Sequence, residues 1–218
     1  MAEPSDVDVL FTQLLQTEDE ALAAARRSTQ AADMPAIEVS AQHGKLLSLL
    51  ATMSGARRVL EIGTLGGYST INLARGVGAD GSVVTLEYEP RHAEVARTNL
   101  QRAGVSDRVE IIVGAALESL PRLAERGDEF DFVFIDADKE NNVAYVEWAI
   151  RLGHPGTVVV VDNVTRFGRV LEPAPDDVQA RAVRDMLQMM GEDPRLDAAA
   201  IQTVGAKGWD GFAVALVT

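Results

Sequence analysis

The sequence of 218 residues contains no cysteine. Disulfide bonds and thiolate chemistry are therefore excluded, and cysteine usage gives no indication of the cellular compartment. Basic residues are also scarce, with 20 lysines and arginines against 33 aspartates and glutamates, for a formal net charge of −13. A nucleic-acid surface needs clustered Lys and Arg, so no nucleic-acid partner is expected, and we attribute the acidity to solubility.

Long hydrophobic runs are absent as well. The longest apolar stretches have the length of a β-strand, which argues against a membrane-spanning helix, and residues 1–6 lack the basic start and apolar core of a signal peptide. We therefore expect a soluble cytoplasmic protein with no membrane partner. With 47% hydrophobic residues, the chain is long enough for one buried core. The expected organisation is a single domain over 1–218, with residues 1–40 as an N-terminal helical extension.

Two hydrophobic stretches end abruptly in polar side chains. Residues 130–135 run into Asp136, Ala137, Asp138 and Lys139, and residues 157–161 run into Asp162 and Asn163. Apolar runs without a helical period are typical of strands that are buried on both faces. Because open α/β sheets bind ligands at the carboxyl ends of their strands, we expect both strands to deliver oxygen ligands to one shared site.

Strands and helices alternate along most of the remaining chain. The pattern predicts strands over 58–62, 82–87 and 109–113, and helices over 68–75, 90–103, 116–126, 141–152 and 176–190. Residues 199–204 and 212–217, separated by a glycine-rich stretch, have the signature of a hairpin. The predicted fold class is α/β: a seven-stranded mixed sheet, mostly parallel, with a C-terminal antiparallel hairpin and helices on both faces.

The N-terminal part is predicted to be helical. Residues 5–31 are expected to form helix, with Val9, Leu10, Leu14 and Leu15 as one apolar stripe. Ser40 is predicted to cap a helix over 41–53, whose inward side chains are expected to be Leu46, Leu47, Leu49 and Leu50.

A glycine-rich turn follows the first strand, with the sequence Gly63-Thr64-Leu65-Gly66-Gly67. A dinucleotide fingerprint needs a second glycine where this chain has Leu65, whose side chain would obstruct a pyrophosphate. The turn is compatible with a cofactor that lacks phosphate, and Glu87 at the end of the second strand could accept hydrogen bonds from both ribose hydroxyls. Such an adenosine ligand points to S-adenosylmethionine. The alternative is that the glycines only permit tight packing and Glu87 is a solvated strand end.

The acid-tipped strands suggest a metal site. Asp136, Asp162 and Asn163 offer hard oxygen donors, which suit Mg²⁺ better than Zn²⁺ and leave Mn²⁺ and Ca²⁺ open. A divalent ion there would favour the ionised form of a substrate hydroxyl, and Lys139 could take the proton. The alternative is that Asp162 and Asn163 form a polar turn while Lys139 pairs with Asp138 on the surface.

Several of these segments resemble the cation-dependent O-methyltransferases of the caffeoyl-CoA and catechol type, which have the Rossmann-like class I methyltransferase fold. The resemblance covers roughly residues 35–218. The similar segments are 59–69 (VLEIGTLGGYS), 114–117 (GAAL), 130–139 (FDFVFIDADK) and 161–163 (VDN).

The resemblance also implies roles for individual residues. It implies S-adenosylmethionine contacts by Val39, Glu61, Gly63, Thr64, Ser69, Glu87, Ala116 and Asp136. It implies that Asp136 and Lys139 are catalytic and that Asp136, Asp162 and Asn163 hold the metal. It also implies a homodimer.

The expected activity is metal-dependent O-methylation of an aromatic vicinal diol, a small-molecule substrate. A metal-independent small-molecule methyltransferase and a non-catalytic S-adenosylmethionine-binding protein are the alternatives. The acceptor stays open, because Val164-Thr165-Arg166-Phe167 stands where plant relatives have an aromatic residue soon after the Asp-Asn pair. Among the histidines, His43 is expected either to cap or pack a helix or to contact the cofactor, while His92 and His154 are assigned to the surface.

Overall fold

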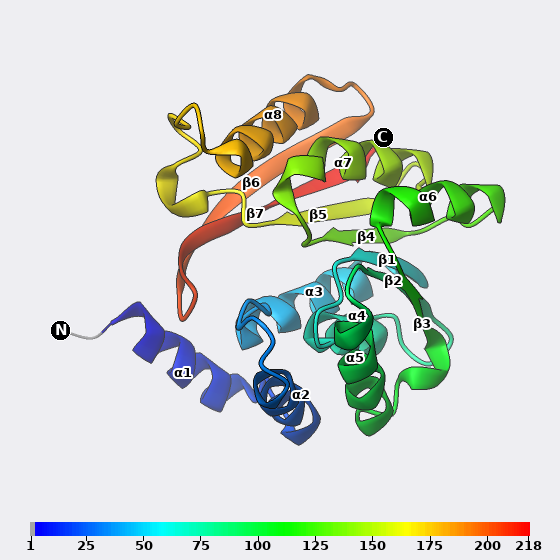
Figure 1. Ribbon diagram of the computed structural model, residues 1–218, viewed down its shortest axis with the longest axis vertical. Coiled ribbons are helices and arrows are strands. Elements are labelled where there is room, and N and C mark those ends of the chain that lie inside the picture. Colours follow the sequence, from blue (N-terminus) through cyan, green and yellow to red (C-terminus); the bar gives the residue numbers. More distant parts are fainter. Residues whose placement is uncertain (1–2) are drawn as a thin grey trace.

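One mixed sheet of seven strands forms the centre of the computed structural model, which describes residues 3–218 (Figure 1). The first two residues of the expected N-terminal extension lie outside the described residues. The strands are β1 (Arg58–Ile62), β2 (Ser82–Glu87), β3 (Val109–Val113), β4 (Phe132–Ile135), β5 (Val158–Asp162), β6 (Leu196–Gly205) and β7 (Gly208–Val217). Their spatial order is β3-β2-β1-β4-β5-β7-β6; β1 to β5 run parallel, and β7 is antiparallel to β5 and β6. The predicted fold class is confirmed.

Helices pack on both faces of this sheet (Figure 1). They are α1 (Pro4–Leu15), α2 (Glu20–Ala31), α3 (Ala41–Met53), α4 (Tyr68–Gly76), α5 (Pro90–Arg102), α6 (Ala116–Glu125), α7 (Asn142–Arg151) and α8 (Val178–Glu192), with short 3-10 helices η1 (Ser106–Arg108), η2 (Lys139–Asn141) and η3 (Arg166–Gly168). Successive side chains of a strand point to opposite faces, so Val59 packs in the core with α3 to α5 while Leu60 packs with α6 to α8. Among residues 3–218, no helix combines the length and the apolar character needed to cross a bilayer.

The strand order reverses between β1 and β4, which is the position where open α/β sheets bind their ligands. β4 and β5 are adjacent, and their residues are almost entirely buried, as the absence of a helical period in the sequence predicted. Asp136 directly follows β4, and β5 ends at Asp162. The two acid-tipped strands therefore reach the same edge of the sheet.

The N-terminal helix differs from the prediction in two ways. Residues 5–31 do not form one helix, because Gln16 adopts a left-handed conformation (φ 50°) and Asp19 caps a new helix by accepting a hydrogen bond from the Leu22 amide at 3.0 Å. In addition, α1 contains no buried residue, and the apolar stripe of Val9, Leu10, Leu14 and Leu15 is exposed. In Figure 1, α1 lies beside the tip of the β6–β7 hairpin and extends away from the other helices.

Two further predictions were wrong in detail. Ser40 does cap α3, by accepting a hydrogen bond from the His43 amide at 3.1 Å, but Leu49 is exposed. Leu49 follows the fully buried Leu47 by two residues, which places it on the opposite side of the helix. The hairpin strands are also longer than expected, because Trp209 and Asp210 pair with Val204 and Thr203 where a loop was predicted.

Candidate functional site

A cavity of about 1310 Å³ lies over the carboxyl ends of the parallel strands. Ten of the eleven predicted site residues line it: Val39, Gly63, Thr64, Ser69, Glu87, Ala116, Asp136, Lys139, Asp162 and Asn163. The eleventh, Glu61, is fully buried in β1, behind the cavity wall. Residues that are up to 124 positions apart in sequence are thus brought to one place by the sheet topology.

The glycine turn after β1 is held by a carboxylate. The backbone amides of Thr64 and Leu65 donate hydrogen bonds to Glu87 Oε2 at 3.1 and 2.7 Å, and Glu87 is only 6% exposed. The alternative in which Glu87 is a solvated strand end is therefore wrong. Its other oxygen lies 3.3 Å from His92 Nδ1. His92 lines the cavity, so its assignment to the surface is wrong as well, whereas the half-exposed His154 does lie at the surface and pairs with Asp131.

Gly63 brings the glycine turn and the end of β4 into direct contact. Its φ is 100°, and a Cβ at this position would lie 2.1 Å from the carbonyl oxygen of Asp136. Only glycine accommodates both the backbone angle and the close approach. The turn after β1 and the first acidic residue after β4 are therefore fixed relative to each other.

Glu61 is a carboxylate without a counter-ion in the core. Its Oε2 accepts hydrogen bonds from the hydroxyls of Thr70 and Thr85 at 2.5 and 2.6 Å, whereas its Oε1 is buried without a partner. Burial raises the pKa of Glu61 to about 7, against the lowering effect of the hydroxyls of Ser69, Thr70 and Thr85. A cationic group near Ser69 would stabilise the ionised form.

Buried Lys139 and partly buried Asp136 form an ion pair. Lys139 Nζ lies 3.0 Å from Asp136 Oδ1, and Lys139 is only 6% exposed. A surface pair between Lys139 and Asp138 is therefore wrong. Asp138 instead accepts a hydrogen bond from the Tyr145 hydroxyl at 2.6 Å.

Asp162 faces this pair, and its ionised form is unfavourable there. Burial, together with the negative charge of Asp136, raises the pKa of Asp162 to about 8, although Lys139 acts in the opposite direction. No cluster of three His, Cys, Asp or Glu side chains within residues 3–218 has the arrangement of a metal centre. A site here would therefore use two carboxylates and the Asn163 amide, all hard oxygen donors. A divalent cation between the carboxylates would remove their repulsion, so the residues present fit such an ion.

Sequence reasoning missed part of this environment. His43 stacks on Phe212 at a ring separation of 5.1 Å, its Nδ1 lies 3.6 Å from Asp162 Oδ2, and burial lowers its pKa. It therefore both packs and borders the acidic site. Asp210 also lines the cavity and accepts hydrogen bonds from the amides of Thr165 and Arg166, which orders the loop after β5. The Asp-Gly pair in the hairpin was the available signal for Asp210.

Comparison of the sequence and structure with those of known proteins identifies the family of this chain. The O-methyltransferase family model matches residues 13–214. The chain is 65% identical to a catechol O-methyltransferase from Mycobacterium tuberculosis, over 98% of this chain and 96% of that protein. A cofactor-bound crystal structure from MTB superposes with a TM-score of 0.96 at 64% identity, covering 100% and 98% of the two chains. A Bacillus cereus O-methyltransferase in complex with SAH also superposes with a TM-score of 0.96, at 47% identity and with 99% and 98% covered. The chain belongs to the O-methyltransferase family.

Proposed function

We propose that this O-methyltransferase transfers the methyl group of S-adenosylmethionine to one hydroxyl of a catechol-like aromatic vicinal diol, with the help of a divalent cation. The observation that carries the proposal is the meeting, in one cavity, of the Glu87-held glycine turn with the Asp136–Lys139 pair and Asp162. The similarity to a catechol O-methyltransferase supports the substrate class.

The cofactor would lie along the carboxyl ends of β1, β2 and β4. Its methionine part would lie against Val39, Gly63, Thr64 and Ser69, with the ammonium group near Asp136 and the buried Glu61. Glu87, which lines the cavity at the end of β2, would accept the ribose hydroxyls. Ala116, at the start of α6, would border the adenine. The SAH in the Bacillus cereus relative supports this class of ligand.

Asp136, Asp162 and Asn163 would hold the cation, with Mg²⁺ as the first candidate and Mn²⁺ or Ca²⁺ as alternatives. When bound, such an ion supplies Lewis acidity that favours the ionised form of an acceptor hydroxyl.

Lys139 is the proposed base. For this step Lys139 first releases its own proton to solvent. Its Nζ would then take the proton of the acceptor hydroxyl, while Asp136 at 3.0 Å orients it and stabilises the ammonium that forms. The hydroxyl oxygen forms a bond to the methyl carbon, the carbon–sulfur bond breaks, and its electron pair stays on sulfur. The products are a methyl ether, S-adenosylhomocysteine and the protonated lysine. The protein contributes mainly alignment of the oxygen, methyl carbon and sulfur in one line.

A catechol panel tests the proposal. S-adenosylhomocysteine release is measured with catechol and with monophenols, with added Mg²⁺ and after exhaustive chelation. We expect turnover with catechol and Mg²⁺ only, and loss of turnover in a folded Asp162→Ala variant. Undiminished turnover after chelation would instead indicate a metal-independent methyltransferase. Binding of S-adenosylhomocysteine without turnover of any acceptor would indicate a binding protein.

We further propose a homodimer in which a second copy covers α1. The exposed Val9, Leu10, Leu14 and Leu15 make an apolar stripe that no other part of residues 3–218 covers. Light scattering of the parent protein should give twice the chain mass of 23.4 kDa. The double variant Leu10→Asp/Leu14→Asp should have the mass of a monomer, whereas the control Gln13→Asp on the same helix should remain a dimer. A monomeric parent protein would contradict the dimer without affecting the proposed chemistry.

A further inference from the structure

Residues 35–40 form an irregular segment that covers part of the cavity, and we call it the roof segment. It lies between α2 and α3, it contains neither helix nor strand, and each of its six residues lines the cavity. An irregular segment has no regular backbone hydrogen bonds to hold it, so its position depends on the packing of its own Val39 in the core and on side chains from elsewhere.

Arg26 of α2 supplies two such contacts. Its Nη1 donates to Glu38 Oε1 at 2.7 Å, and its Nη2 donates to the carbonyl oxygen of Val39 at 3.0 Å. Val39 is only 5% exposed and lines the cavity. Arg26 therefore binds the roof segment through both a side chain and the backbone.

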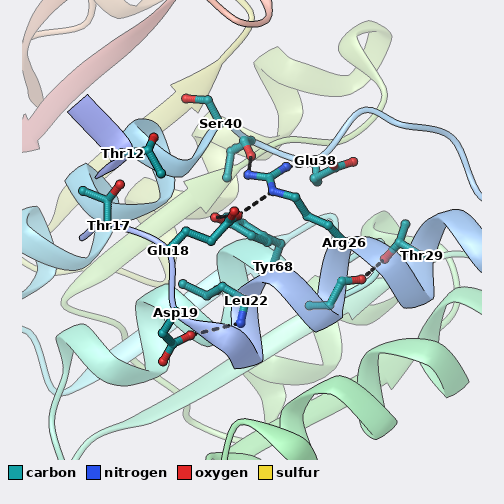
Figure 2. Close-up of polar contacts among 12 residues, drawn as sticks. Thr12, Thr17, Glu18, Asp19, Leu22, Arg26, Thr29, Glu38, Ser40 and Tyr68 are labelled. Carbon is teal, nitrogen blue, oxygen red and sulfur yellow. Dashed lines mark hydrogen bonds and ion pairs between the residues drawn. The ribbon is translucent and has the colours of Figure 1, made fainter. Parts of the chain in front are cut away.

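Tyr68 and Glu18 also hold the guanidinium of Arg26 in place. Figure 2 shows it above the ring of Tyr68, and the distance from its central carbon to the ring centroid is 4.0 Å. Nε donates to Glu18 Oε1 at 2.6 Å, and the Tyr68 hydroxyl donates to the same oxygen at 2.6 Å. Burial raises the pKa of Tyr68, and the hydrogen bond to Glu18 raises it further, so the phenol remains a donor. The cation is held by a carboxylate and an aromatic ring together.

Tyr68 and α2 both belong to the wall around the glycine turn. Tyr68 is the first residue of α4, directly after Gly67, and it also lines the cavity. α2 packs so closely on the turn that a Cβ at Gly66 would lie 2.0 Å from Thr29 Oγ1. Arg26 thus connects the roof segment to the turn on the other side of the cavity.

Glu38 gives a second indication that the cluster serves a ligand. Its Oε2 is buried without a hydrogen-bond partner, and Glu38 is among the residues that line the cavity. Without Arg26, two partly buried carboxylates, Glu18 and Glu38, would also lose their shared cation. Removing one partner from such a cluster leaves uncompensated charge, which the irregular segment can relieve only by moving.

We propose that Arg26 is a positioning residue that keeps the roof segment closed over the methyl donor and thereby sets how tightly the donor and its demethylated product are retained. This inference rests on the proposed function, because it takes S-adenosylmethionine and S-adenosylhomocysteine as the ligands. Arg26 acts through Glu38 and Val39. The N-terminal helix α2 is then part of the cofactor site, although it contributes no residue to the cavity lining.

The test compares Arg26→Met with Arg27→Met by calorimetric titration of S-adenosylhomocysteine, which requires neither acceptor nor metal. Arg27 is the next residue of the same helix and pairs with Glu20 on the exposed surface, so it controls for loss of a helical arginine. If the roof segment is closed in only about 1–10% of Arg26→Met molecules, the apparent affinity falls about 10- to 100-fold. Arg27→Met should bind within about two-fold of the parent protein, because an exposed pair contributes little.

Two further measurements and a fallback variant separate positioning from general damage. The KM for S-adenosylmethionine should rise in Arg26→Met while kcat at saturation changes less than about three-fold, because uniform binding is lost. Amide exchange in residues 36–40 should accelerate without ligand, while exchange in β4 stays the same. If Arg26→Met does not fold, Arg26→Lys takes its place, since lysine keeps the charge but cannot reach Glu18, Glu38 and Val39 together.

Equal S-adenosylhomocysteine affinity in the parent, Arg26→Met and Arg26→Lys proteins would overturn the inference and leave the proposed function standing. An equal loss in Arg26→Met and Arg27→Met would overturn it too. No binding of S-adenosylhomocysteine by the parent protein would overturn the proposed function itself, and this inference with it.

Discussion

Replacing Glu61 with glutamine should stabilise the protein in a pH-dependent way. Glu61 is fully buried, and burial raises its pKa from 4.5 to about 7. At about 1.4 kcal/mol per pKa unit, ionising it in the folded state costs about 3 kcal/mol. Glutamine keeps an oxygen that accepts the hydroxyls of Thr70 and Thr85 but carries no charge.

The sign of the pH dependence follows from the raised pKa. Between pH 4.5 and about 7 the unfolded chain has lost the Glu61 proton while the folded protein keeps it, so the stability of the parent protein declines as pH rises through this window. Above about pH 7 the parent protein bears the full cost of ionising Glu61 in the folded state. The stability advantage of Glu61→Gln should therefore be roughly 2 kcal/mol larger at pH 8 than at pH 5.

The assay is guanidinium unfolding of the ligand-free parent protein and Glu61→Gln at both pH values. Glu110→Gln is the matched control, because Glu110 lies on β3 and pairs with Arg126 at the surface. Its effect on stability should be small at both pH values, because an exposed pair contributes little. An advantage of Glu61→Gln that is the same at pH 5 and pH 8 would refute the reasoning, since Glu61 would then be ionised throughout. In the proposed function, S-adenosylhomocysteine should stabilise the parent protein more than Glu61→Gln.

Three more substitutions test other parts of the structure. Gly63→Ala should destabilise the protein by about 3 kcal/mol or more in guanidinium unfolding, because it combines a left-handed backbone with overpacking against the Asp136 carbonyl. The control Gly104→Ala, with φ of 68° and open space around its Cβ, should cost only about 1 kcal/mol. Equal costs for the two substitutions would contradict the contact between Gly63 and Asp136. Lys139→Ala should lower kcat about 10²- to 10⁴-fold and leave S-adenosylhomocysteine affinity nearly unchanged, with the exposed Lys45→Ala as control; parallel loss of turnover and affinity would argue against a base. His154→Gln should destabilise the protein by less than roughly 1 kcal/mol at pH 5.5 and by less still at pH 8.5. The Pro155 carbonyl and Asp131 raise the pKa of His154, so the stability that the protonated histidine contributes is lost as pH rises through that pKa. A larger loss of stability in the variant at pH 8.5 than at pH 5.5 would contradict this sign.

The sheet and the acidic edge of the site were predictable because their signals are local. β4 and β5 consist almost entirely of buried residues, so their sequences have no polar face that could be confused with a helix or a surface strand. Once two neighbouring parallel strands are known, the side chains that follow them must lie near each other. Asp136 and Asp162 therefore follow from the topology alone.

The contacts that join distant segments were not predictable. Arg26 contacts Glu38 and Tyr68, which lie 12 and 42 positions further along the chain. No local sequence pattern around an arginine in a helix predicts contacts at such separations. The pairing of His92 with Glu87 was missed because it depends on where α5 begins. The split between α1 and α2 was missed because the apolar stripe before it and the alanine-rich stretch after it both favour helix, whereas the break itself is set by the caps at Gln16 and Asp19.

The contact of Gly63 with the Asp136 carbonyl limits which sequence changes the two loops that it joins can accept. An insertion in either of the two loops would displace both the glycine turn, which is proposed to bind the donor, and the acid beside Lys139, so neither loop can vary alone. The loop after β5, helix α1 and the β6–β7 hairpin border the same cavity without sharing that contact. If the proposed site is right, those three segments can change to bind new acceptors while the residues proposed to hold the methyl donor stay the same.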